Sequence, residues 1–191
     1  MNPIIDPQGY GDQSDHTKNR RTFFRASGAG ATSLVLAAAL PAQASAGRHA
    51  KKVVAYHGMP WEEPYGYAQA VKMGDTIYIS GQLSHDDKGN IIGPAPLDAH
   101  GRVTDFSNTE IQMQQTYKNA RMLLAKFGAT LDNVVEEVIY VLDMDTAFAV
   151  AGPVRKKAYN TAHPLVASTI LVTPRLALPT QLLEIRFVAR V

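Results

Sequence analysis

Residues 67–82 of this 191-residue chain read YAQAVKMGDTIYISGQ. Strand-forming side chains alternate on either side of the pair Gly74-Asp75. Alternation with a period of two is typical of a strand with one buried face, and a Gly-Asp pair between two such runs favours a tight turn. The stretch therefore predicts a β-hairpin made of residues 67–73 and 76–82.

Further strands are predicted on both sides of this hairpin. They comprise a short run before it and three runs after it, at residues 53–56, 134–142, 167–173 and 181–191. In the last run every second residue is apolar, which places Glu184 and Arg186 on the opposite face from the apolar set Leu183, Ile185, Phe187 and Ala189. Residues 61–66, between the first run and the hairpin, are expected to form a loop.

The clearest helix is predicted at residues 105–127. Apolar side chains recur there at three- and four-residue steps, as on one face of an amphipathic helix. Ser107 or Asn108 can cap its start, and Gly128 is a typical residue after a helix end. A central strand at 134–142 is expected to follow.

A second helix is expected to begin at Asp143 or Asp145 and to continue to about Tyr159. Gly152-Pro153 is expected to delay its start or to kink it. The order β-β-β-α-β-α-β-β indicates an α+β domain with two helices on one face of a β-rich sheet. The other face carries polar residues such as Glu184, so water or another subunit must cover it.

Glu184 is the residue with the most chemical interest. One interpretation is a plain surface ion pair with Arg186, which lies two residues further on the same face. The other is a carboxyl in a partly dry cleft, where its pKa would rise and it could position or activate water. The spacing alone leaves both interpretations open.

Several functional classes have no support in the sequence. The chain has no cysteine, which excludes disulfides, thiol nucleophiles and Cys-bound metals. The histidines lack the spacing of metal ligands, and the sequence predicts no metal site and no cofactor. Beyond residue 46 the chain holds 15 basic and 14 acidic residues, a balance that does not favour nucleic-acid binding.

The first 46 residues have the pattern of an export signal. Arg20-Arg21 precedes Phe23-Phe24, a run of small and apolar residues, and the exit Ala44-Ser45-Ala46. This pattern predicts a twin-arginine (Tat) signal peptide after a polar leader, with a linker at 47–51, a domain at 52–191 and a periplasmic location. The apolar segment is short for a membrane span, although an uncleaved anchor is the alternative.

Five short motifs, in the same order along the chain, resemble those of the RidA family, also called YjgF. They are YAQAV with GDTIYISGQ at 67–82, a helix asparagine at Asn119, GATLDNVV at 128–135, VLDM at 141–144 and LEIR at 183–186. The resemblance covers about residues 52–191. It implies a chorismate-mutase-like α+β subunit and a homotrimer in which the sheets line a central barrel.

The resemblance also implies an activity and a set of site residues. Family members hydrolyse reactive enamines and imines to ketoacids and ammonia, in clefts between subunits. Matched residue by residue, the closing glutamate that holds the attacking water is Glu184. The matching binding residues are Tyr67, Ser80, Gly81, Gln82 and Asn119.

One family residue is missing from this chain. The arginine that clamps the substrate carboxylate falls at Ser168 when the family's P-A-R-[ST] stretch is matched to residues 166–169. A serine cannot supply a bidentate, charged hydrogen-bond donor. The chain therefore resembles the branches that lack this arginine, and His163, Arg175 or Arg186 could replace the cation.

Three functional hypotheses follow from these patterns. The first is an exported deaminase with altered substrate choice, a C=N hydrolase that uses Glu184. The second is a trimer that binds a small molecule in the same cleft without catalysis. The third is a structural or interaction module. The expected partners are a small-molecule ligand, further copies of the chain, and the Tat translocase during export, with no nucleic acid and no stable membrane span once the signal is removed.

Overall fold

The computed structural model describes residues 51–191. The predicted signal peptide at 1–46 and all but the last residue of the predicted linker lie outside the described residues. The strands are β1 (Val53–Ala55), β2 (Ala70–Met73), β3 (Thr76–Gln82), β4 (Val134–Val141), β5 (Ala167–Val172) and β6 (Leu183–Arg190). The helices are α1 (Glu62–Tyr65), α2 (Thr109–Ala125) and α3 (Met144–Tyr159), with a 3-10 turn η1 (Leu131–Asn133) before β4.

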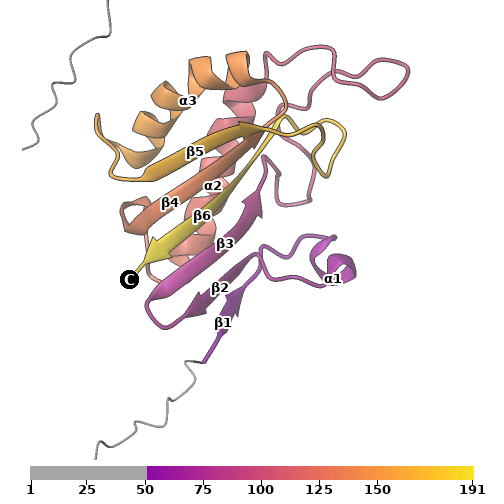
Figure 1. The fold of residues 1–191 in the computed structure, drawn as a ribbon. Helices are drawn as coiled ribbons and strands as arrows, with labels where there is room; N and C mark the ends of the chain where they lie inside the picture. Colours follow the sequence, from indigo (N-terminus) through magenta and orange to yellow (C-terminus); the bar gives the residue numbers. More distant parts are fainter. Residues whose placement is uncertain (1–50) are drawn as a thin grey trace, which may run out of the picture. The chain divides into compact units, whose positions relative to one another are not determined.

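The six strands form one sheet in the order β1-β2-β3-β6-β4-β5 (Figure 1). Four of the five strand pairs are antiparallel, and only β4 and β5 run parallel. A parallel pair needs a long crossover connection, and α3 supplies it between β4 and β5. The predicted hairpin is confirmed as β2 and β3, with Met73 opposite Thr76.

The two long helices cover the same face of the sheet. Tyr117 of α2 and Tyr159 of α3 both reach the side chain of Glu137, which projects from β4. Their rings lie edge to face, with centroids 6.1 Å apart. The α+β architecture with two helices on one sheet face is therefore as the sequence predicts.

Strand β6 divides its side chains between the two faces. Leu183, Ile185, Phe187 and Ala189 are at most 1% exposed and belong to the core under the helices. The alternate residues Glu184, Arg186 and Val188 are only partly buried and lie on the face that the helices leave open. The predicted separation of apolar and polar residues in this strand is confirmed.

The helix ends differ in detail from the sequence prediction. Helix α2 begins at Thr109, because Asp105 accepts hydrogen bonds from Ser107 and keeps this segment in a turn. Asp143 caps α3 by accepting from the N–H of Thr146 at 2.9 Å, and the helix continues through Pro153. Residues 62–65, expected in a loop, form the single turn α1.

Strand β3 contains a bulge close to its end. Ile79 pairs with Phe187 and Gln82 pairs with Ile185, so β3 has one more residue than β6 between these two pairs. The extra residue lies in the segment Ser80-Gly81. Bulges re-aim side chains, and this one places Gln82 opposite a core residue of β6.

None of the helices in residues 51–191 has both the length and the apolar character required of a membrane span.

Candidate active site

Glu184 lies half-buried on the open face of the sheet, in β6. One carboxylate oxygen accepts a hydrogen bond from Nε2 of Gln181 at 3.2 Å. Burial raises the pKa of Glu184 because a charged carboxylate is less well solvated there, while the Gln181 bond lowers it to a smaller extent. The raised pKa makes Glu184 a better proton acceptor than an exposed carboxylate, as the cleft interpretation requires.

Gly81 lies directly against this carboxylate. A Cβ atom at position 81 would come within 1.9 Å of Oε1 and 2.4 Å of Cδ of Glu184. Any side chain at position 81 must therefore displace the Glu184 carboxylate. The bulge in β3 and the missing side chain together make room for Glu184 where the strand ends.

A chain of polar side chains runs beneath the site. His57 Nε2 lies 3.0 Å from Oε1 of Gln82, and Nε2 of Gln82 lies 2.9 Å from Oε1 of Gln69. Nε2 of Gln69 lies 3.3 Å from the hydroxyl of Tyr67. The two glutamines are at most 2% exposed. Tyr67 thus joins the predicted site to a buried network.

The environment of Tyr67 keeps its phenol protonated. Burial raises its pKa, and the charges of Glu62 and Glu184 act in the same direction. Hydrogen-bond donation from Trp61 and Gln69 opposes this rise without cancelling it. The phenol of Tyr67 is therefore a hydrogen-bond donor rather than a charged group at neutral pH.

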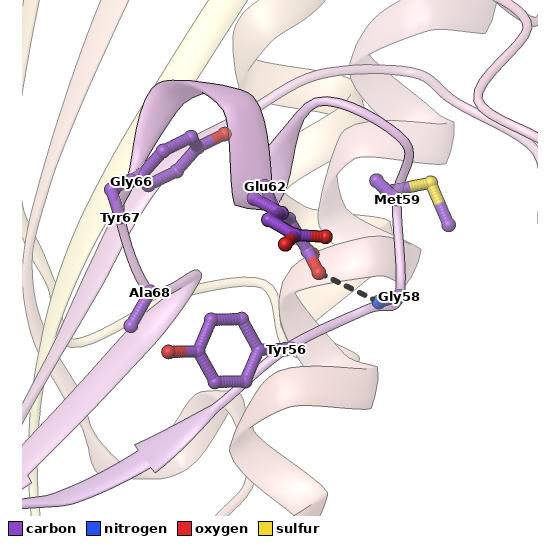
Figure 2. Close-up of a pocket in the computed structure, with 8 residues that line it drawn as sticks. Tyr56, Gly58, Met59, Glu62, Gly66, Tyr67 and Ala68 are labelled. Carbon is purple, nitrogen blue, oxygen red and sulfur yellow. Dashed lines mark hydrogen bonds between the residues drawn. The ribbon is translucent and has the colours of Figure 1, made fainter.

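A cavity of about 610 Å³ lies beside Tyr67 (Figure 2). Its walls come from the β1–α1 loop, α1 and the segment between α1 and β2, and comprise Tyr56, Gly58, Met59, Glu62, Glu63, Gly66, Tyr67 and Ala68. Glu62 is only 7% exposed and accepts from the backbone N–H groups of His57 (2.8 Å) and Gly58 (2.9 Å). This carboxylate fixes the loop that forms one wall, and the volume suits a small molecule.

The side chains of two predicted binding residues, Ser80 and Asn119, form hydrogen bonds to the protein backbone. The Ser80 hydroxyl donates to the carbonyl of Ala68 at 2.8 Å and ties β3 to the segment that precedes β2. The Asn119 amide donates to the carbonyls of Leu83 and His85 at 2.8 and 3.1 Å, which joins α2 to the loop after β3. These bonds hold the walls around Gly81, and the predicted contact of Ser80 and Asn119 with a substrate stays a prediction.

Ser168 is not brought together with Glu184. It pairs in register with Glu137 of β4 and therefore points to the helix-covered face. Its hydroxyl accepts from Arg155 Nη2 at 2.7 Å, and Arg155 Nε lies 2.5 Å from the buried carboxylate of Glu137. Arg155 is thus the cation next to Ser168, on the opposite side of the sheet from Glu184.

Sequence reasoning did not single out His57, Gln69, Glu62 or the Glu137–Arg155 pair. His57 and Glu62 lie in a segment without periodic pattern, so no sequence signal was available for them. Glu137 did carry a signal, because in a strand of period two it falls among core positions such as Ile139 and Val141. In residues 51–191, no cluster of three or more histidine or acidic side chains is arranged to hold a metal ion.

Comparison with known proteins identifies the family. The family model described as endoribonuclease L-PSP matches residues 62–191. A RutC family protein of Saccharolobus solfataricus is 33% identical over 84 residues, covering 43% of this chain and 56% of the relative. The 2-iminobutanoate/2-iminopropanoate deaminase of Dermatophagoides farinae is 25% identical over 103 residues, which cover 53% of this chain and 70% of the deaminase. The chain thus spans little more than half the length of the first of these relatives.

Solved structures agree with this assignment. A YjgF-family protein of Mycobacterium tuberculosis superimposes with a TM-score of 0.57 at 23% identity, covering 74% of this chain and all of that one. RidA from an Antarctic Psychrobacter gives a TM-score of 0.53 at 26% identity, and the match covers 65% of this chain and 88% of that RidA. The chain belongs to the endoribonuclease L-PSP family, the family of the RidA and YjgF proteins.

Proposed function

We propose that this protein hydrolyses the C=N bond of a reactive imine, or of the enamine in equilibrium with it, to a carbonyl compound and ammonia. The observation that carries the proposal is the half-buried Glu184, whose pKa is raised and whose carboxylate lies against Gly81. A relative in the same family bears the name 2-iminobutanoate/2-iminopropanoate deaminase.

The reaction needs one water and one group that carries a proton in both directions. Glu184 takes a proton from water while the oxygen attacks the C=N carbon, and a carbinolamine forms. The carboxyl gives this first proton to the nitrogen as the carbinolamine forms. It then takes the proton of the carbinolamine hydroxyl and passes it to the nitrogen, the C–N bond breaks, and ammonia leaves as the carbonyl forms. A raised pKa favours both steps, because proton transfer is most effective when the pKa lies near the working pH.

The substrate is proposed to differ from that of family members with the clamping arginine. Within residues 51–191, burial and Gln181 account for the pKa of Glu184, and no cation contributes. Arg186 on the same strand pairs with Glu136. These contacts support a substrate that lacks a carboxylate or is held by other groups, of which His163 and Arg175 are candidates.

The working form is proposed to be a homotrimer with clefts between subunits. The face of the sheet opposite the helices supports this, because it exposes large apolar side chains. Val54, Met73 and Tyr78 are 48%, 43% and 52% exposed. A neighbouring subunit would cover this face and would close the site around Glu184.

The protein is also proposed to act in the periplasm after export by the Tat route. The Arg20-Arg21 pattern in residues 1–46 supports this. Replacing both arginines by lysine should leave the protein in the cytoplasm, as measured by cell fractionation. Export of the double variant at the wild-type level would contradict the proposal.

A panel of imines tests the proposed reaction and the substrate class together. Ammonia release is measured with pairs of imines that differ only in whether a carboxylate is present. The proposal expects faster turnover of the member without the carboxylate. A preference for the carboxylated member would contradict the altered substrate choice, and no turnover of any member would contradict deaminase activity.

A second candidate is a binding protein without catalysis. The cavity beside Tyr67 supports it, because its size suits a small molecule whether or not chemistry follows. Retention of a small molecule by the purified protein, with no turnover of the imine panel, would favour this candidate.

A further inference from the structure

We propose that His57, Gln82 and Gln69 are positioning residues that make Tyr67 a hydrogen-bond donor to the bound substrate. The inference rests on the proposed site at Glu184. In the buried network each side chain donates a hydrogen bond to the next one, from His57 to Tyr67. The hydroxyl hydrogen of Tyr67 is then left to donate to the substrate.

The direction is set at Gln82. Its Nε2 lies 3.0 Å from the backbone carbonyl of Ser80 and 2.9 Å from Oε1 of Gln69. A backbone carbonyl can only accept a hydrogen bond, so the Gln82 atom that lies beside the Ser80 carbonyl must be the amide nitrogen. Oε1 therefore faces His57, and because it can only accept, His57 must carry a hydrogen on Nε2.

The same direction continues through Gln69. Its Oε1 accepts from Gln82, which leaves its Nε2 to donate to the hydroxyl oxygen of Tyr67 at 3.3 Å. The phenol oxygen is thus occupied as an acceptor, and its own hydrogen is available to another molecule.

Burial gives this arrangement its effect. Gln69 and Gln82 are 2% and 1% exposed, so water does not compete for their amide groups. Hydrogen bonds that run in one direction through a low-dielectric interior polarise one another and sharpen the donor at the end. The site then offers a donor at Tyr67 and a proton acceptor at Glu184. A substrate with an acceptor atom beside the carbon that water attacks, such as an imine nitrogen, complements this pair.

Gln69→Glu tests the direction with almost no change in shape. A carboxylate at position 69 can still accept from Gln82 but has no hydrogen to donate, so Tyr67 must turn its own hydrogen inward. We expect kcat/KM to fall roughly tenfold, as for one lost hydrogen bond. In a Tyr67→Phe background the same substitution should cause no further loss. Fully additive losses would overturn the proposal.

His57 provides a pair of matched variants. Gln at position 57 keeps a donor for Gln82 and should preserve kcat/KM, whereas Leu removes the donor and should lower it. Equal losses in both variants would show that His57 acts through packing alone and would overturn its positioning role.

One measurement needs neither a variant nor activity. Nitrogen-15 NMR of the wild-type protein should show His57 with hydrogen on Nε2. A neutral ring with hydrogen on Nδ1 and a bare Nε2 would overturn the proposed direction. If no imine is turned over, the proposed function fails, while this measurement still decides the direction of the chain.

Discussion

At the scale of single residues, the carboxylate of Glu184 combines a functional advantage with an energetic cost. The carboxylate is half-buried beside Gly81 and receives one hydrogen bond from Gln181. Such residues persist where chemistry requires them, and replacing them often raises stability at the expense of activity. Glu184 and its immediate neighbours therefore allow function and stability to be tested separately.

The first prediction concerns stability at position 184. Because burial raises the folded-state pKa of Glu184 above 4.5, its contribution to stability is fully present in acid and is lost as the pH rises through the folded-state pKa. A Gln at position 184 stays uncharged at all pH values. Glu184→Gln should therefore have a larger free energy of unfolding than wild type at pH 7, and the difference should shrink toward pH 4. Urea denaturation at both pH values measures this, and lower stability of the variant at pH 7 would contradict it.

The second prediction concerns the glycine beside the carboxylate. Gly81→Ala forces the Glu184 side chain aside, and a displacement of about 1 Å at a reacting group can cost roughly 100-fold in rate. Because a flexible side chain absorbs the clash, the free energy of unfolding should fall by only about 1 kcal/mol. The control is Gly152→Ala in α3, where an added Cβ meets open space. Alanine favours a helix over glycine by about 1 kcal/mol, so this variant should gain that much free energy of unfolding. Unchanged kinetics in Gly81→Ala would argue against Glu184 as the reacting group.

At the scale of elements, β4 has two neighbouring glutamates with opposite environments. Glu137 is fully buried and binds Arg155, Tyr117 and Tyr159, which links β4 to both long helices. Burial and the Glu137 charge raise the pKa of both phenols, so they remain donors to this carboxylate. Glu136 points to the open face and pairs with Arg186, with about 40% of both side chains exposed.

This contrast gives the third prediction. Glu137→Ala leaves Arg155 and two phenols without their partner and should cost about 3–5 kcal/mol of unfolding free energy. Glu136→Ala removes a surface ion pair and should cost less than about 1 kcal/mol. Thermal or urea unfolding of the two variants compares them directly, and similar losses would contradict the buried role of Glu137.

Most of the secondary structure could be predicted because its elements are periodic. The hairpin and β6 follow a period of two, and α2 follows steps of three and four. The single turn α1 could not be predicted, because four residues carry no period and Pro64 suggested a loop. The carboxylate of Glu62 in this turn accepts hydrogen bonds from two backbone N–H groups, and these belong to a segment without any recognisable motif.

The site was predictable only in part, because neighbouring residues of a strand point to opposite faces of the sheet. Glu184 and Gly81 could be found from short motifs, and the structure places them in contact. Ser168 is the position where the family arginine falls by counting along a motif, and in a strand a shift of one residue in that count moves the position to the other face. Ala167, one position earlier, pairs with Glu136 and shares its open face, while Ser168 shares the face of Glu137.

At the scale of the whole molecule, the open face of the sheet predicts self-association. Tyr78 is 52% exposed at the centre of this face, between Val71 and Val188 of the neighbouring strands. A glutamate at position 78 would place a charge in a subunit interface. Light scattering after gel filtration should give three times the subunit mass for wild type and a lower mass for Tyr78→Glu.

Phe148 in α3 supplies the control for this fourth prediction. It is 71% exposed on the side of the sheet that carries the helices. Phe148→Glu should therefore leave the trimer mass unchanged. A monomeric wild type, or equal effects of the two substitutions, would contradict assembly through the open face.

The most direct test of the account is the rate of imine hydrolysis with and without the Glu184 carboxylate. Initial rates of ammonia release are compared for wild type, Glu184→Gln and buffer, on the imine of the panel that is turned over fastest. Loss of a general acid–base group should lower kcat by about 10²–10⁴-fold, so the variant should approach the buffer rate. Equal rates for wild type and Glu184→Gln would contradict the claim that Glu184 activates the attacking water.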